Sequence, residues 1–128
     1  MISHLLFSIP GVKSVEFGDG FACVDKRGSK RNDRYVNDEF KTLTNNEGGV
    51  NGGISNGNAI RFRIAVKPTP SIGLPQDTYD TREECMTKLQ IVGRHDMCFA
   101  TRVPVIVESA AAIALMDLYL IHKTQSMK

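Results

Sequence analysis

Hydrophobic and polar residues alternate most regularly between positions 60 and 67. The apolar positions are Ile60, Phe62, Ile64 and Val66, and those between them are Arg61, Arg63, Ala65 and Lys67. Because successive side chains on a strand point to opposite faces, this alternation predicts a strand with one apolar and one largely cationic face. Pro68 and Pro70 follow at once. Proline cannot continue a β-ladder, so we expect the strand to end there.

Two further segments carry the apolar residues that are typical of strands. They are residues 12–17 and residues 83–92. Glycines at residues 18–20 predict a turn after the first of them. Beyond this turn, residues 21–24 are expected to resume the strand.

The remaining segments before the C-terminal quarter have weaker patterns. Residues 2–7 resemble the end of a helix, and the cation-rich residues 26–34 predict a solvated, mobile loop. Residues 35–43 fit either a strand or a loop. Residues 72–81 contain glycine and proline, and we expect a loop there.

The most apolar segment begins at Pro104, a residue that suits the first turn of a helix. Nearly every side chain from position 110 to 121 is apolar. A helix that is apolar nearly all round is buried, so residues 104–123 predict a buried helix. Glu108 and Asp117 interrupt the apolar run, and a transmembrane span needs about 20 mainly apolar residues, so no span is expected.

Length and composition fit a single cytosolic domain over residues 1–128. The chain has 128 residues, of which 41% are hydrophobic, which is enough for one core. Its net charge of +2 gives no global argument for nucleic acid, and we expect neither nucleic-acid nor membrane partners. Cys23, Cys85 and Cys98 have no Cys/His spacing typical of a metal site, so we expect no metal and reduced thiols.

A glycine-rich segment, residues 48–57, precedes the alternating strand. Its glycines leave backbone N–H groups uncovered and reach positive φ without steric cost. Successive N–H groups of this kind can form a concave anion site. Together with Thr69, Ser71 and the cationic strand face, the segment suits a phosphorylated ligand. A plain hairpin with a Gly-rich turn and a solvated basic edge explains the same residues.

Three separated motifs resemble chorismate synthase and occur in the order found in that family. They are SIPGVKSVEFGDGF at residues 8–21, GGISNG followed by FRIAVKPTPSI at residues 52–72, and GRHDMC at residues 93–98. The resemblance covers nearly the whole chain and corresponds to the C-terminal portion of that enzyme. It implies an α+β fold in which an antiparallel sheet packs on a buried helix, as part of a sheet–helix–sheet sandwich.

The resemblance also implies an activity and its setting. Chorismate synthase converts 5-enolpyruvylshikimate 3-phosphate to chorismate and phosphate in the shikimate pathway of aromatic amino acid biosynthesis. This lyase reaction is redox-neutral yet needs reduced flavin mononucleotide (FMN), and the protein binds, orients and tunes the cofactor. The family is cytoplasmic and forms homotetramers, so we expect a homo-oligomer.

The matching motif positions define the expected site. The residues expected to bind the flavin are Pro10, Gly11, Gly52, Lys67, Pro68, Thr69, Pro70, Ser71 and Arg94. Arg94 is also expected to hold substrate, because a guanidinium can bind a phosphate or carboxylate bidentately. Asp96 matches a carboxylate beside the flavin that could relay a proton, although a turn aspartate is the simpler interpretation. His95 is interpreted as a structural neighbour.

The sequence departs from the chorismate synthase motifs at two positions, and it lacks the catalytic histidines of the family. Met97 stands where relatives usually have proline, and Pro104 comes one residue early, which leaves the helix start open. The two catalytic histidines of the family belong to its N-terminal portion, and neither His4 nor His122 matches them.

Three functions therefore compete. The chain is part of an active chorismate synthase, or a non-enzymatic module that binds FMN or assembles with a full-length subunit. The third, a nucleic-acid-binding domain built on residues 26–34, lacks interleaved aromatics and any recognition motif.

Overall fold

The computed structural model describes residues 1–126 and divides the chain into two compact units. The first unit, Met1–Val66, contains α1 (Ile2–Phe7), β1 (Val12–Phe17), the 3-10 helix η1 (Gly20–Cys23), α2 (Gly28–Arg31), β2 (Val50–Asn51), β3 (Ile54–Ser55) and β4 (Phe62–Val66). The second unit, Lys67–Lys128, contains β5 (Gln76–Asp80), β6 (Cys85–Leu89), the 3-10 helix η2 (Phe99–Arg102) and α3 (Val103–Ser126). Antiparallel strand pairs with helices confirm the α+β class.

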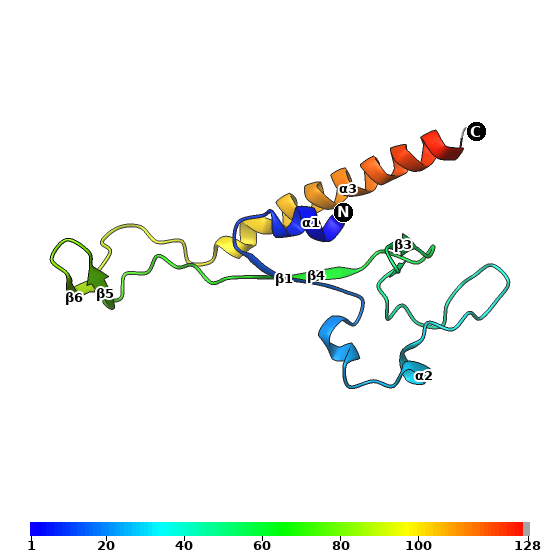
Figure 1. Cartoon of the computed structure of the whole chain (residues 1–128), viewed down its shortest axis with the longest axis horizontal. Helices are drawn as coiled ribbons and strands as arrows, with labels where there is room; N and C mark the ends of the chain where they lie inside the picture. Colours follow the sequence, from blue (N-terminus) through cyan, green and yellow to red (C-terminus); the bar gives the residue numbers. More distant parts are fainter. Residues whose placement is uncertain (127–128) are drawn as a thin grey trace. The chain divides into compact units, whose positions relative to one another are not determined.

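Strands β1 and β4 form the central ladder of the first unit and lie side by side (Figure 1). Phe17 pairs with Phe62, and their ring centroids are 5.7 Å apart. Along β4 the apolar side chains are half-buried and the intervening ones exposed, which confirms the predicted alternation. The strand begins at Phe62 rather than at Ile60.

The expected continuation of β1 through residues 21–24 is wrong, because this segment forms η1. Gly18 and Gly20 have φ of 60° and 55°, a left-handed conformation that takes the chain out of the strand. The backbone N–H of Phe21 then donates to the Glu16 carboxylate at 3.0 Å. The chain therefore turns back on β1.

Backbone hydrogen bonds close the base of a long loop, residues 19–47, that joins β1 to the glycine-rich segment. Gly18 N–H donates to the Arg61 carbonyl at 2.9 Å, and Arg61 N–H donates to the Gly48 carbonyl at 3.0 Å. Within the loop, residues 35–43 form no regular strand, and only an isolated bridge joins Tyr35 to Thr42. The two ends of the loop are thus held together at the start of β4.

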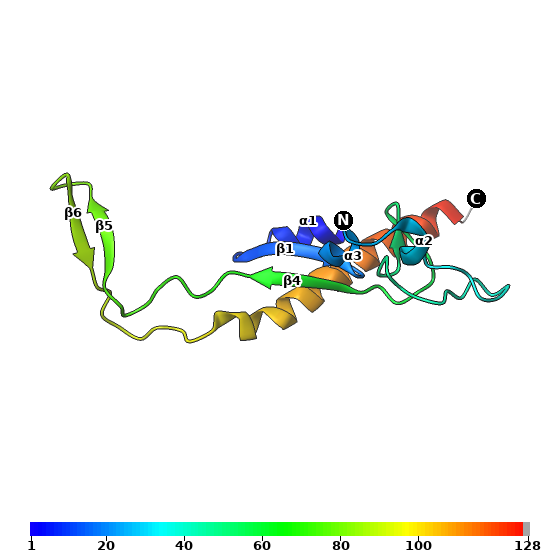
Figure 2. The same ribbon diagram turned by 90° about the horizontal axis from the view of Figure 1, so that it is seen from below.

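Strands β5 and β6 form an antiparallel hairpin in the second unit (Figure 2). The predicted loop over residues 72–81 is wrong where β5 lies, and β6 is shorter than the predicted strand over 83–92. Asp80 organises the turn, because its Oδ1 accepts from the N–H groups of Arg82 at 2.8 Å and Glu83 at 3.2 Å. Asp77 and Lys88 face each other across the ladder and pair at 2.7 Å.

Helix α3 confirms the predicted C-terminal helix, starting at Val103 and extending to Ser126. In the described residues, however, it buries only Val103 and Ala114, whereas the sequence predicts a buried helix. Ile113 and Leu120 are 63% and 55% exposed. Residues Phe99–Ser126 are long and apolar enough to cross a membrane, a test of length and composition that core helices of soluble proteins also pass.

Candidate functional site

A hydrogen bond in the second unit joins two of the segments expected to bind flavin. Ser71 Oγ lies 3.1 Å from His95 Nδ1. On the other side of the ring, His95 Nε2 lies 3.1 Å from the Ile91 carbonyl oxygen. The Gln90 amide donates to the Gly73 carbonyl at 3.2 Å, which joins the residues that flank these two segments. Residues 67–71 are therefore tied to residues 93–96.

Residues 67–71 have no regular secondary structure, and three of their side chains, those of Lys67, Thr69 and Ser71, carry hydrogen-bond donors. The Thr69 hydroxyl oxygen is shielded from solvent and has no hydrogen-bond partner among residues 1–126. Lys67 is exposed and takes part in no ion pair in the same range. A buried polar atom without a partner is costly, so an outside group that accepts a hydrogen bond would relieve it. A phosphate offers such acceptors, and these residues fit it.

Arg94 and Asp96 flank His95 but differ in their surroundings. Arg94 is exposed and forms no ion pair within the described part of the chain. Both terminal nitrogens of the Arg102 guanidinium donate to the Asp96 carboxylate, at 3.2 and 2.8 Å. This bidentate pair fixes the direction of the carboxylate and offsets its charge. Sequence reasoning used Arg102 only to locate the helix start, because a partner six residues away leaves no local pattern.

The first unit contains Pro10, Gly11 and Gly52, the other residues expected to bind flavin. Pro10 and Gly11 form the turn between α1 and β1, where Gly11 has φ of 92°. Gly52 lies in the turn between β2 and β3, with φ of 57° and open space where a Cβ would stand. These residues can offer backbone groups to a ligand.

The glycine-rich segment does not act as one cradle, because its members have different surroundings. A Cβ on Gly48 would lie 2.3 Å from the Gly18 nitrogen and 2.5 Å from the Arg61 carbonyl oxygen. Gly48 is therefore required for close backbone packing. Of the expected anion nest, Gly52, Gly53 and Gly57 keep an open surface.

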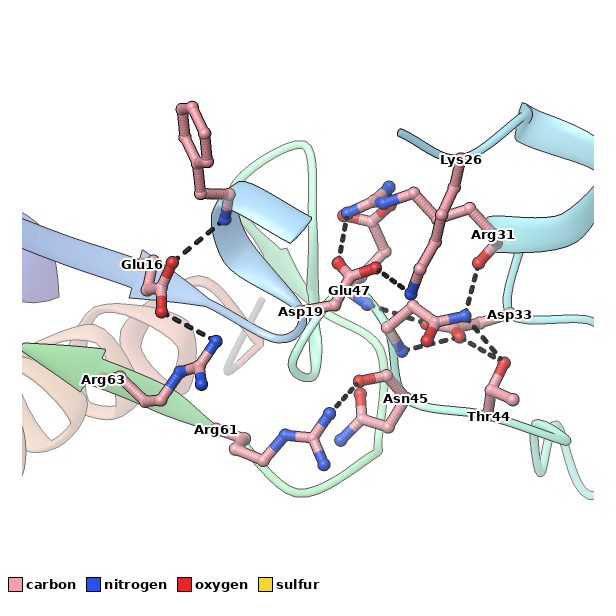
Figure 3. Close-up of polar contacts among 12 residues, drawn as sticks. Glu16, Asp19, Lys26, Arg31, Asp33, Thr44, Asn45, Glu47, Arg61 and Arg63 are labelled. Atoms are coloured by element: carbon pink, nitrogen blue, oxygen red, sulfur yellow. Dashed lines mark hydrogen bonds and ion pairs between the residues drawn. The ribbon is translucent and has the colours of Figure 1, made fainter. Parts of the chain in front are cut away.

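The cationic face predicted for the strand at 60–67 is largely engaged within the first unit (Figure 3). Arg63 pairs with Glu16 at 2.7 Å, its partner position on β1. The Arg61 guanidinium donates to the Asn45 carbonyl at 2.9 Å. These two cations thus stabilise local structure, and of the three only Lys67 has a side chain without an ion pair or hydrogen bond among residues 1–126.

The Asp33 carboxylate accepts hydrogen bonds from residues near the end of the long loop (Figure 3). Its Oδ1 accepts from the Thr44 hydroxyl at 2.7 Å and the Asn46 N–H at 2.8 Å, and its Oδ2 accepts from the Glu47 N–H at 3.0 Å. Burial raises the pKa of the Asp33 carboxyl, but the bonds from Glu47, Thr44 and Asn46 outweigh it and leave the pKa below its usual range. Sequence reasoning missed this role, because Asp33 meets residues that are distant in the chain.

An ion-pair network lies beside Asp33 in the segment of residues 26–34, for which the sequence predicts a solvated loop; most of these residues are exposed, and Gly28–Arg31 form α2. Asp19 pairs with Lys26 at 2.9 Å and with Arg31 at 3.2 Å, and Arg31 also pairs with Glu47. The hydrogen bond from Lys26, with the charges of Lys26 and Arg31, holds the pKa of the Asp19 carboxyl below its usual range. Two cations of this segment, Lys26 and Arg31, therefore stabilise the loop.

A polar cavity of about 300 Å³ lies in the first unit between this loop and the β2–β3 hairpin. It is lined by Asn32, Asp33, Tyr35, Thr42, Glu47, Asn51, Ile54, Ser55 and Asn56. Asp33, Glu47 and Asn56 already have partners within the unit. Four residues of the glycine-rich segment, Asn51, Ile54, Ser55 and Asn56, line the cavity, whereas Gly52 does not.

Comparison with known proteins gives one family throughout. The sequence matches the chorismate synthase family over residues 1–120. Chorismate synthase from Chitinophaga pinensis is 46% identical, with 95% of this chain and 37% of that protein covered. The enzyme from Pyrococcus abyssi is also 46% identical, with 99% of this chain and 36% of that protein covered.

A solved structure agrees with these relatives. A crystal structure of chorismate synthase is 40% identical in sequence and superposes with a TM-score of 0.50, covering 55% of this chain and 22% of that one. The chain spans about a third of the length of the relatives above, which are covered over 36–37% of their own length. The chain belongs to the chorismate synthase family.

Proposed function

We propose that this chain supplies part of the flavin and substrate site of a chorismate synthase, which converts 5-enolpyruvylshikimate 3-phosphate to chorismate and phosphate. Family membership supports the reaction. The observation that carries the site assignment is the Ser71–His95 hydrogen bond. It joins residues 67–71 to the segment that contains Arg94 and Asp96.

Four residues of the second unit have distinct roles in the proposed site. Reduced FMN, when bound, supplies the transient electron that the redox-neutral elimination requires. Lys67 offsets the charge of the cofactor phosphate, and the Thr69 hydroxyl donates a hydrogen bond to it. Arg94 holds the phosphate or carboxylate of the substrate. Asp96, oriented by Arg102, relays a proton.

In the first unit, the proposal assigns backbone contacts to the flavin from Pro10, Gly11 and Gly52. Asp33 and Arg61 have a structural role instead, since they bind backbone atoms of the long loop. The proposal also places the protein in the cytoplasm, as part of a homo-oligomer.

The chain by itself should bind FMN without turning over substrate. It spans about a third of its relatives' length, and the catalytic histidines of the family match none of its residues. General acid–base groups typically contribute about 10²–10⁴-fold each to the rate. A non-enzymatic FMN-binding or assembly module is therefore the second candidate, favoured by the large exposed apolar surface of α3.

The test is an anaerobic titration of the chain with reduced FMN, followed by an assay of chorismate formation. Saturable binding without turnover is expected. Addition of the missing portion of a chorismate synthase should restore turnover if the chain is part of the enzyme, and should not if it is only a module. Absence of any FMN binding would contradict the proposed flavin site and would leave only an assembly module.

A further inference from the structure

The two contacts of the His95 ring determine which nitrogen carries its proton. The Ile91 carbonyl oxygen can only accept a hydrogen bond, so the neighbouring Nε2, at 3.1 Å, must donate. In the neutral imidazole the other nitrogen, Nδ1, then has a lone pair and accepts. Ser71 Oγ lies 3.1 Å from Nδ1, so the serine hydroxyl is the donor.

This direction limits what Ser71 can offer to a ligand. A serine hydroxyl has one proton and two lone pairs, and here the proton points at His95. Phosphate oxygens at neutral pH are acceptors, so Ser71 could donate to a phosphate only by leaving the histidine. Groups that donate, such as a sugar hydroxyl or a ring N–H, can bind to its free lone pairs without that loss.

We propose that His95 is a positioning residue that makes Ser71 a hydrogen-bond acceptor, so that Ser71 binds a donor group of the flavin, a ribityl hydroxyl or a ring N–H, and not the phosphate. The inference rests on the proposed function and refines it. The phosphate is then bound by Lys67 and Thr69. The shielded Thr69 hydroxyl has no hydrogen-bond partner among residues 1–126.

The surroundings of His95 hold this arrangement in place. Gly73 lies against the ring, since a Cβ built there would be 3.5 Å from Nε2. The Gln90 amide holds the Gly73 carbonyl at 3.2 Å. Rotation of the ring would break both of its hydrogen bonds, to Ile91 and to Ser71.

The first experiment compares FMN with riboflavin, which lacks the phosphate, as ligands of the chain and its variants. Ser71→Ala should weaken both ligands equally, by about two- to tenfold, the value of a neutral hydrogen bond. Lys67→Ala should weaken FMN selectively. Ser109→Ala is the matched control, because the Ser109 hydroxyl bonds to the Val105 carbonyl within α3. A selective loss of FMN affinity in Ser71→Ala, or no loss at all, overturns the proposal.

The second experiment separates positioning from simple packing by using two amides at position 95. His95→Asn keeps an acceptor oxygen near the place of Nδ1 and should preserve the affinity for both flavins. His95→Gln keeps a donor that can reach the Ile91 carbonyl but leaves the Ser71 hydroxyl without the acceptor that orients it. Its affinities for FMN and riboflavin should fall together, by about two- to tenfold. Equal affinities in the two variants would contradict the positioning role.

The third experiment needs no flavin, so that failure of the inference can be told from failure of the proposed function. Long-range ¹H–¹⁵N correlation spectra recorded at about pH 8, above the usual titration range of histidine, report the tautomer directly. The expected signature at His95 is a protonated Nε2 with an Nδ1 resonance that shifts in Ser71→Ala. A protonated Nδ1 overturns the inference whether or not flavin binds. If the tautomer is as expected and neither flavin binds, the proposed function fails and flavin recognition by Ser71 fails with it.

Discussion

At the residue scale, some cationic side chains of this chain are already paired within the protein and others are not. Arg61, Arg63 and Arg31 are held by carbonyl or carboxylate groups of the first unit. Lys67 and Arg94 take part in no ion pair within residues 1–126. An anionic ligand gains most from a cation that gives up no other partner, which makes these two side chains the ones to vary first.

Lys67→Ala should lower the affinity for reduced FMN by about ten- to hundredfold, because a charge-assisted hydrogen bond contributes about 1.5–3 kcal/mol. Riboflavin affinity should change little, since that ligand has no phosphate. Titration of both flavins, followed by fluorescence, measures the difference. An equal loss for both would show that Lys67 does not bind the phosphate.

Asp96→Asn is the companion change and should behave differently. A carboxylate beside a reduced, electron-rich flavin repels added charge, so the amide should bind FMN equally well or more tightly. Turnover, measured once the missing portion of the enzyme is supplied, should fall. A clear loss of FMN affinity in this variant would place Asp96 in binding instead of in the proton transfer.

At the element scale, the strands that could be predicted are those whose own residues show a clear apolar pattern. Strand β4 alternates apolar and polar side chains with a period of two, and β1 has enough apolar residues to be recognised. Strand β5, Gln76–Asp80, is polar, and its stability comes from pairing with β6 and from the turn at Asp80. Such cross-strand interactions cannot be read from one segment alone.

Gly48→Ala should destabilise the first unit strongly, by more than about 3 kcal/mol. The new Cβ would meet backbone atoms at 2.3 and 2.5 Å, and φ is +68°. Gly52→Ala is the control, because it has a similar φ but open space, and should cost about 1–2 kcal/mol. Urea unfolding followed by circular dichroism compares the two, and similar losses would contradict the packing role of Gly48.

Helix α3 should make the isolated chain associate at high concentration, since its large apolar side chains are exposed. Replacing Ile113 and Leu120 together by glutamate should reduce both self-association and binding of hydrophobic dyes. Glu108→Gln, on the same helix, is the control. Analytical ultracentrifugation provides the measurement, and a monodisperse monomer that binds no dye would count against the prediction.

At the scale of the whole molecule, the candidate site was less predictable than the fold. The motif residues were named from family resemblance, whereas the groups that organise them were not. Asp33 meets Asn46 and Glu47, and Asp96 meets Arg102, in contacts that only the folded chain creates. The hydrogen bond between Ser71 and His95 likewise spans 24 positions and follows no local periodicity.

The first unit should lose stability in acid because Asp19 and Asp33 both have lowered pKa values. Their unfolded carboxyls titrate near about 3.9, above the folded values, so the unfolded state binds more protons as the pH falls. The stabilisation is complete above about pH 5 and is lost progressively below it. Asp33→Asn should flatten this dependence, and urea midpoints measured from pH 7 to about pH 2.5 test it. An unchanged slope in the variant would exclude Asp33 as a contributor.

The closed base at Gly18, Gly48 and Arg61 has a consequence for how the family can vary. The chain leaves and re-enters the strand pair at a point closed by backbone hydrogen bonds, and the contacts of Asp33 and Arg31 hold the loop just beyond it. A change of length at the far end of the loop therefore does not disturb the strand pair. Doubling the length of such a loop costs only about 0.6 kcal/mol in closure entropy. Its far end carries Val36 and Phe40, which are 57% and 70% exposed. Insertions or deletions near residues 36–40 should therefore leave the register of β1 and β4 intact, which makes this the natural place for homologous enzymes to differ in length.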